Sequence, residues 1–120
     1  MQDFKKLTVW PKSHKPTLEV YRITIDFPGR ERFGLAPQLR SSVLSVASNI
    51  AEGSARGGDS EFRRFAYIAL ASACELECQL LIARDLSFLA PEIHGRLDDA
   101  CEEVRKMPWS LICRLDRVRR

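Results

Sequence analysis

The chain has 120 residues, the length of one ordinary domain, and such a length buries about two thirds of the unfolded surface without disulfides or metals. Its 45% hydrophobic and 29% charged residues are typical of a water-soluble globular protein, and no apolar run approaches the ~20 residues of a membrane-spanning helix. The net charge of +3 is too small to indicate a nucleic-acid-binding protein by itself. We therefore expect one domain over residues 1–120. The charged start of the chain lacks the apolar core of a signal peptide and predicts a cytoplasmic protein without a membrane partner.

The chain opens with an extended arm expected over residues 1–8, followed by a first helix that ends near Phe27. One stripe of this helix has its side chains at the spacing of three and four residues that indicates a buried face. The stripe consists of His14, Leu18, Tyr21 and Ile25. We expect it to pack in the core, with His14 partly buried and hydrogen-bonded rather than catalytic, because no acid or nucleophile is placed beside it.

Pro16 falls inside this first helix. An interior proline removes a backbone hydrogen bond and costs about 3 kcal/mol. Two alternatives follow: the helix is kinked at Thr17, or its regular part begins at Pro16. Pro28 and Gly29 end the helix, and a loop is expected over residues 30–35.

A second helix is expected from about Ala36, with Pro37 in its first turn, where the missing amide costs nothing. Its apolar positions have the spacing of a bundle seam. They are Leu39, Val43, Val46 and Ile50. Serines fill the positions between them, and such small side chains let another helix approach closely, including a helix of a neighbouring subunit. These serines are Ser41, Ser42, Ser45 and Ser48.

The stretch from Asn49 to Phe65 predicts a helix end, a tight turn and the start of the next helix. We expect Gly53 to take the left-handed conformation that closes a helix, and the pair at 57–58 to reverse the chain. Asp59 is expected to cap the next helix with its side-chain oxygen. The sequence therefore predicts a helical hairpin.

A third helix is expected from about Ser60 to Leu86 or Leu89, and a fourth from about Pro91 to beyond Leu115, with a kink at Pro108. Residues 118–120 are expected to fray. The expected seam of the third helix is Phe62, Phe65, Ala69, Ala73, Leu76, Leu80 and Ala83, and that of the fourth is Ile93, Leu97, Ala100, Val104, Met107, Leu111 and Val118, with Leu115 alongside. The predicted fold is all-α, an antiparallel up-and-down four-helix bundle.

The four cysteines, Cys74, Cys78, Cys101 and Cys113, are expected to be buried free thiols. No pair has zinc-ligand spacing, and a disulfide framework is not expected in a cytoplasmic chain. Neither histidine has a glutamate three positions before it, as di-iron bundle enzymes require. There is also no phosphate-binding glycine loop and no nucleophile elbow. We therefore predict no catalytic residues, no metal, no cofactor and no enzymatic activity.

A series of short motifs runs in order from Asp3 to Glu77. The motifs are Asp3-Phe4-Lys5-Lys6-Leu7, Val9-Trp10, Val20-Tyr21, Phe27-Pro28, Phe33-Gly34-Leu35, Gln38-Leu39-Arg40, Ser48-Asn49-Ile50-Ala51-Glu52-Gly53, Arg56, Glu61-Phe62, Arg64-Phe65 and Glu75-Leu76-Glu77. In these residues the chain resembles the four-helix-bundle family of 23S ribosomal RNA intervening-sequence proteins. The resemblance implies a ring of subunits, a homopentamer. It also implies a link to nucleic acid, because such proteins are encoded inside ribosomal RNA genes. A similar protein, the accessory variability determinant of diversity-generating retroelements, works with a reverse transcriptase.

Two sets of residues are candidates for a site. The first is a polar lock at the hairpin, in which Glu52 or Glu61 pairs with Arg56 or Arg64 beside Asn49. The second is a set of basic residues for contact with phosphates, although such residues often form only a solvated surface. This set is Lys5, Lys6, Lys12, Arg40, Arg56, Arg63 and Arg64.

Acidic and basic residues are also segregated along the chain, with acids prevailing from Glu75 to Glu103 and bases from Arg105 onward. Such segregation suits either attraction between subunits or a polyanion partner. We expect a non-enzymatic oligomeric protein with RNA or DNA as the preferred partner. The alternative is a protein–protein interaction scaffold that has no nucleic-acid role.

Overall fold

The computed structural model describes residues 9–56 and 58–119. Within these ranges the chain forms four α-helices and no strand: α1 (Val9–Thr24), α2 (Leu35–Ala55), α3 (Asp59–Asp85) and α4 (Pro91–Arg119). A short 3-10 helix, η2 (Gly29–Phe33), replaces the loop expected between α1 and α2. The arm predicted over residues 1–8 lies outside the described residues. The backbone of α4 remains helical to Arg119, past the point where we expected the helix to fray, and Arg120 is not described.

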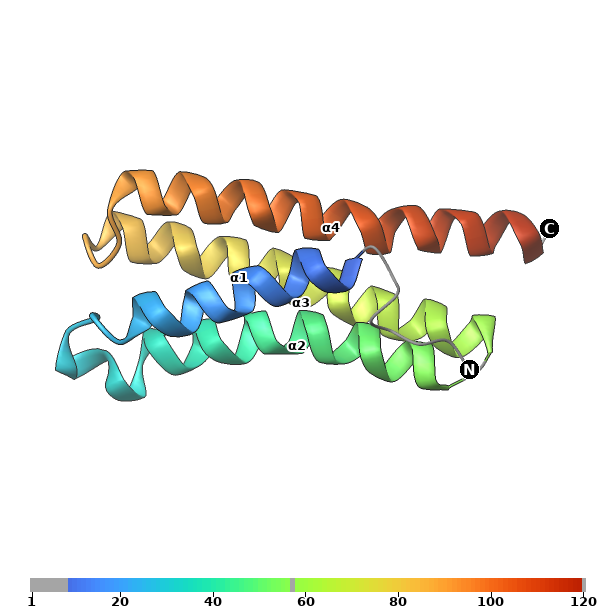
Figure 1. Ribbon diagram of the computed structural model, residues 1–120, viewed down its shortest axis with the longest axis horizontal. Helices are drawn as coiled ribbons and strands as arrows, with labels where there is room; N and C mark the ends of the chain where they lie inside the picture. Colours follow the sequence, from blue (N-terminus) through green and yellow to red (C-terminus); the bar gives the residue numbers. More distant parts are fainter. Residues whose placement is uncertain (1–8, 57, 120) are drawn as a thin grey trace.

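The helices run antiparallel along an elongated body of 48 × 21 × 20 Å, and Figure 1 shows two of the connections at one end and the α2–α3 turn at the other. Each helix packs against two neighbours in the cyclic order α1, α2, α3, α4. The described parts of α1 and α3 make no close backbone contact, nor do those of α2 and α4, so these pairs occupy opposite corners. The all-α four-helix fold is thus confirmed, whereas assembly into a ring stays a prediction.

The inner faces of α2 and α3 are the seams that the spacing predicted, and every residue named for these two seams is buried. In α4 the predicted positions Leu97, Val104 and Leu115 are buried, while Ile93 and Ala100 are half-buried. The side chains of Met107, Leu111 and Val118 lie outside the described residues. Helical periodicity therefore identified the inner face of three of the four helices.

The inner face of α1 differs from the prediction. Its expected core stripe faces outward: Leu18, Tyr21 and Ile25 are exposed, and so is His14. The buried side contains Val20 and Pro16 but is otherwise small and polar, with Ser13, Thr17 and Thr24. These threonines fit a core because each hydroxyl donates to a backbone carbonyl one turn back, at 2.7 Å to Ser13 O and 2.8 Å to Val20 O.

The two interior prolines do not divide their helices. α1 begins at Val9 and continues through Pro16, so the alternative in which its regular part begins at Pro16 is wrong. α4 likewise continues through Pro108, whose side chain is fully buried.

The hairpin is present, but its glycine acts differently from the prediction. α2 continues past Gly53 to Ala55, and Gly53 is buried inside the helix rather than left-handed at its end. A Cβ at this position would lie 2.8 Å from the Cβ of Phe65, so the missing side chain lets α3 approach α2. Gly58, in an extended conformation, is the N-cap of α3, and Asp59 is the first residue of the helix. Among the described residues no side chain forms a capping hydrogen bond at this helix start, so the prediction that Asp59 caps α3 is wrong.

Serines of α2 also bring α3 close, within this chain. Ser42 Oγ donates to Gln79 Oε1 at 2.9 Å in the buried interface, and the hydroxyls of Ser45 and Ser72 are 2.8 Å apart. Small polar residues at helix contacts shorten the distance between axes, and here each has a partner that satisfies it. This explains two of the four serines by contacts inside the chain. Ser41 and Ser48 are exposed.

The helix α3 is more apolar than its inner seam requires. One window of 18 residues has a mean hydropathy of 1.5, so by length and composition alone the helix is able to cross a membrane, contrary to our expectation from the sequence. Within the bundle 44% of this window is buried, and core helices of soluble proteins pass the same test. The apolar residues outside the inner seam are therefore on its outer side.

Candidate nucleic-acid interface

Both ion pairs of the predicted polar lock are present, and both are local. Arg56 Nη2 lies 2.8 Å from Glu52 Oε1 one turn earlier, and Arg64 Nη2 lies 3.2 Å from Glu61 Oε2. The hydrogen bonds from Arg64 hold the pKa of Glu61 below its ordinary value. Neither pair links α2 to α3, because each joins residues of one helix or its cap. These ion pairs therefore support the helix ends and do not fix the turn.

An aromatic ring joins the two arginines of the hairpin instead. The guanidinium carbon of Arg56 lies 5.3 Å from the ring centroid of Phe65, and that of Arg64 lies 4.4 Å from it. Cation–π contacts of this kind contribute about 0.5–1 kcal/mol at exposed sites. Since Arg56 follows α2 and Phe65 belongs to α3, this contact crosses the turn. The sequence placed these residues near one another but did not identify the ring as their partner.

Asn49 does not join the polar lock. Its side-chain amide donates to the carbonyl oxygen of Ser45 at 2.8 Å and to the hydroxyl of Ser45 at 3.0 Å. Ser45 in turn bonds to Ser72, so Asn49 extends the polar contact between α2 and α3.

Two further phosphate candidates are bound to carboxylates. Arg63 Nε lies 2.5 Å from Asp116 Oδ1, which ties α3 to the far end of α4, and Arg63 also covers the Tyr67 ring at 4.9 Å. Lys12 Nζ lies 2.9 Å from Glu103 Oε2, and this hydrogen bond holds the pKa of the Glu103 carboxyl below its ordinary value. A cation with a carboxylate partner has less charge to offer to a phosphate. Lys5 and Lys6 lie outside the described residues.

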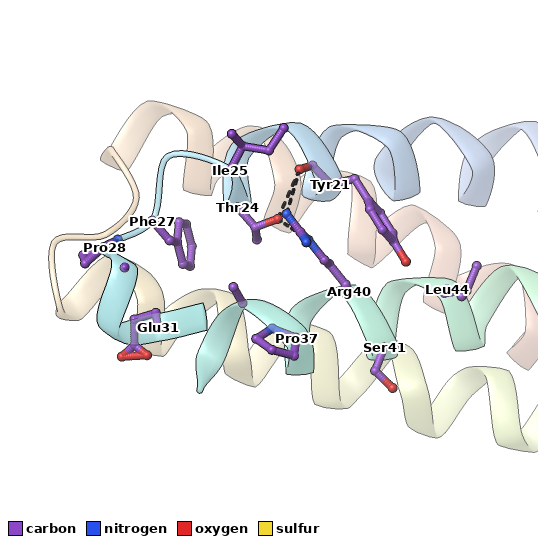
Figure 2. A pocket seen from close by; sticks show the side chains of 12 residues that line it. Tyr21, Thr24, Ile25, Phe27, Pro28, Glu31, Pro37, Arg40, Ser41 and Leu44 are labelled. Carbon is purple, nitrogen blue, oxygen red and sulfur yellow. Dashed lines mark hydrogen bonds between the residues drawn. The ribbon is translucent and has the colours of Figure 1, made fainter. Parts of the chain in front are cut away.

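Arg40 is held by α1 rather than by an acid. Its Nε donates to the hydroxyl of Thr24 at 2.7 Å, its Nη2 reaches the carbonyl oxygen of Tyr21 at 3.5 Å, and its guanidinium lies 5.3 Å from the Tyr21 ring. Figure 2 shows these contacts in the groove between α1 and α2, which has a volume of about 690 Å³. Ile25 and Leu44 also line this groove.

The five predicted phosphate-binding residues that the structure describes do not converge on one site. Arg40 and Arg56 are separated by about 24 Å along α2, at ~1.5 Å per residue. Arg56, Arg63 and Arg64 gather at the hairpin end, but each has a carboxylate partner. The described members of this set therefore do not form one cluster of unpaired positive charge, which a polyanion site needs.

A different groove, between α1 and α4, has an excess of positive charge. Its volume is about 990 Å³, and its apolar lining residues are Pro16, Ile23 and Ala100. Four basic and two acidic side chains also line the groove, a formal excess of two positive charges: Lys12, Lys15, Arg22 and Arg96 against Glu19 and Glu103. Both carboxylates are already occupied by ion pairs across the groove, Glu103 with Lys12 and Glu19 with Arg96.

Lys15 and Arg22 have no carboxylate partner among the described residues, and the same holds for Arg114 and Arg117 of α4. Arg114 follows Glu103 by three helical turns, so it lies on the side of α4 that faces α1. Figure 1 shows that α4 runs on beyond the start of α1. In the sequence, these α4 arginines belong to the basic segment from Arg105 onward. That segment predicted that basic and acidic residues are segregated, but not which surface of the bundle the basic residues occupy.

The cysteines are only partly as predicted. Cys101 is buried, and burial raises the pKa of its thiol to about 12, which makes it unreactive. Cys113 is half-buried, but Cys74 and Cys78 are exposed, and the prediction that they are buried is wrong. Among the described residues no group of three or more histidine, cysteine or acidic side chains is arranged to hold a metal ion.

Comparisons with known proteins agree with this fold. The structure is similar to the crystal structure of a protein of unknown function from the S23 ribosomal protein family of Bacteroides thetaiotaomicron. The TM-score is 0.79 at 22% sequence identity, over 88% of this chain and 98% of that one, which shows a shared fold. No curated protein matches the chain. Neither this solved structure nor the family model that matches the chain indicates an enzymatic activity. The model of the 23S rRNA-intervening sequence proteins matches residues 5–110, so the chain belongs to the 23S rRNA-intervening sequence protein family.

Proposed function

We propose that this protein is a non-enzymatic, self-assembling helical protein that binds the phosphate backbone of RNA or DNA in the cytoplasm. The observation that carries the proposal is the α1–α4 groove, where Lys15 and Arg22 have no carboxylate partner and the lining has a formal excess of two positive charges. Arg114 and Arg117 extend this basic surface beyond the groove. This surface replaces the hairpin arginines as the preferred interface.

Assembly makes a small excess of charge effective. The net charge of one chain is only +3, but several copies in one particle present the same groove at fixed spacings. Each added contact then forms within an existing complex, so overall affinity rises without any new type of contact. We propose a homopentamer, as expected from the resemblance. Static light scattering would then give a mass of five chains of 13.7 kDa each.

Contacts of this type are with phosphates and do not select a sequence. No base-reading element is part of the proposal, and single- and double-stranded RNA and DNA are all candidate ligands. Affinity should fall steeply with salt, because each neutralised phosphate releases counterions.

The test is fluorescence anisotropy with labelled RNA and DNA over a range of salt concentrations. A variant with Lys15→Gln, Arg22→Gln and Arg114→Gln should bind more weakly, and its log–log salt slope should be lower by about 1 per lost contact. The matched control removes an equal number of charges at the hairpin, with Arg56→Gln, Arg63→Gln and Arg64→Gln, and should change binding less.

A third variant, with Lys5→Gln and Lys6→Gln, tests the two lysines that lie outside the described residues. If the hairpin variant lost more affinity than the groove variant, the first assignment from the sequence would be restored. Absence of binding at low salt by assembled wild-type protein would refute the nucleic-acid role and leave the protein-interaction scaffold.

A further inference from the structure

The outward side of α1 forms an apolar surface together with α2. Ile25 is 73% exposed, and Leu18 and Tyr21 are exposed on the same stripe. Leu44 of α2 continues this surface across the groove of Figure 2. We call Leu18, Tyr21, Ile25 and Leu44 the α1 face. Large apolar side chains that share one stripe at helical spacing indicate a packing surface.

A second apolar surface lies on the outward side of α3. Six exposed residues follow one another at spacings of three or four, the rhythm of a helix-packing seam. They are Ile68, Ala71, Glu75, Cys78, Ile82 and Leu86, which we call the α3 face. α3 therefore has two seams, one inside the bundle and one outside. The outer seam accounts for the excess hydropathy of this helix.

These two faces are on different sides of the molecule. α1 and α3 each pack against α2 but make no close backbone contact with each other in the described chain, so they occupy opposite corners. Symmetric pairing of one face with itself would cover that face and leave the other in water. A head-to-tail contact covers both faces in every copy, and such contacts close into rings when the rotation permits.

The charges on the two faces are complementary. Arg40 lies in the groove of the α1 face and has no carboxylate partner among the described residues. Glu75 lies in the middle of the α3 face; its carboxylate accepts a hydrogen bond from Gln79 but has no cationic partner there. Pairing the α1 face with itself would bring two arginines together, and pairing the α3 face with itself would bring two glutamates together. Only the mixed contact joins opposite charges.

The sides of the bundle are large enough for a stable contact. The body is 48 Å long and 20 to 21 Å wide, so side-by-side packing along its length can cover about 800 Å² per partner, the area of a standard interface.

We propose that the α1 face of one copy packs against the α3 face of the next copy. This inference rests on the proposed self-assembly and specifies which surfaces carry it. The contact leaves the α1–α4 groove at the surface of the assembly, since that groove is on the other side of α1. The occupant of both apolar faces is therefore a second copy of this chain.

Mixing two disabled variants tests the head-to-tail arrangement. Leu18→Asp with Ile25→Asp removes the α1 face, and Ile68→Asp with Ile82→Asp removes the α3 face. Each variant alone should have the mass of one 13.7 kDa chain in light scattering. An equimolar mixture should form a dimer, because the intact α3 face of the first variant meets the intact α1 face of the second.

Leu81→Asp is the matched control. Leu81 is 42% exposed and its neighbour Ile82 is 45% exposed, but Leu81 follows Glu77 by one turn, on the side of α3 that faces α4. This variant should assemble like the wild type. Circular dichroism must show wild-type helicity for every variant. If the control also lost assembly, charge alone would explain the effect and the surface assignment would be wrong.

Chemical cross-linking is a second test, for the case in which one interface alone is too weak to hold the mixed dimer together during light scattering. With Cys74→Ser, Cys113→Ser and Ile25→Cys, a flexible bis-maleimide should join position 25 of one copy to Cys78 of the next and give a ladder of covalent oligomers. Adding Cys78→Ser should abolish the ladder. A covalent dimer that persists without Cys78 would show that the α1 face pairs with itself, and would overturn the proposal.

The outcomes separate the two proposals. A monomeric wild-type protein would refute self-assembly itself. An assembled wild type whose mixed variants remain monomeric and whose cross-links do not require Cys78 would refute only the head-to-tail surfaces. If the α3-face variant alone stopped the protein from binding lipid vesicles, α3 would be a membrane contact, and the proposal would also be wrong.

Discussion

Gly53 lies in a close contact between α2 and α3, and Gly53→Ala tests whether this contact holds the hairpin. The new methyl carbon would be 2.8 Å from the Cβ of Phe65, 3.4 Å from Cδ1 of Phe62 and 3.6 Å from its Cα. Carbon atoms pack best at about 3.5–4.0 Å, so the first distance is too short by almost 1 Å. The Cβ of Phe65 is fixed to the α3 backbone and cannot rotate away. The helices must therefore separate.

The magnitude follows from two opposing terms. Overpacking a tight contact costs about 1–3 kcal/mol, whereas replacing glycine by alanine inside a helix stabilises it by about 1 kcal/mol. The net effect of Gly53→Ala on the free energy of unfolding is thus a loss of about 0–2 kcal/mol. Gly95 lies in α4 with nothing within 4 Å of a Cβ, so Gly95→Ala has only the favourable term. The two variants should differ by about 1–3 kcal/mol.

Urea denaturation followed by circular dichroism measures this difference, at one protein concentration because assembly adds to apparent stability. In thermal melts the gap should be roughly 4 °C per kcal/mol for a domain of this size. If Gly53→Ala and Gly95→Ala stabilised the protein equally, the close approach of α2 and α3 at Gly53 would be refuted.

Three further variants test the packing. Ser87 follows the end of α3 in the left-handed conformation, with a φ of 64°, and Phe88 N donates to Ala83 O at 2.9 Å. Because glycine adopts this conformation without strain, Ser87→Gly should raise the free energy of unfolding by about 0.5–1 kcal/mol in urea denaturation. A loss of stability would contradict the left-handed cap. Ser42→Ala should lower the free energy of unfolding by about 1–3 kcal/mol, because it leaves the buried Gln79 side-chain oxygen without its hydrogen-bond donor. The control, Ser48→Ala at an exposed position, should stay within about 0.5 kcal/mol of wild type. Equal effects of the two variants would refute the polar contact. Burial raises the pKa of the Glu77 carboxyl above its ordinary value despite Arg105, so ionisation costs stability as pH rises through that raised pKa. Glu77→Gln should therefore gain stability relative to wild type as the pH rises above the ordinary pKa of a carboxyl group, and a pH-independent difference would refute this.

Much of the fold could be predicted because three helices have one dominant apolar stripe. In α2 the spacing of Leu39, Val43 and Ile50 identified the buried side, and in α3 the spacing of seam residues such as Ala69 and Ala73 did the same. The boundaries of α3 and α4 were also close to the prediction, since Pro91 separates them. These features depend on local spacing, which the sequence states directly.

The candidate site was harder to predict because charge pairing depends on which helix faces meet. Arg63 and Asp116 are far apart in sequence, yet they form an ion pair between α3 and α4. Lys12 is bound to Glu103 in the same way. A lysine or arginine has the same appearance in a sequence whether its charge is neutralised or free. The unpaired cations could be identified only after the helices were placed.

By itself the sequence determined the number of helices, their approximate ends, the family and the residues that share each helical stripe. The tertiary structure decided which way two of these stripes point. Leu18, Tyr21 and Ile25 have the periodicity of a core seam but face outward, and α3 has a second seam on its outer side. Periodicity shows that side chains share a face. It does not indicate whether that face packs inside the chain or against another chain, because both bury apolar area with the same gain in free energy.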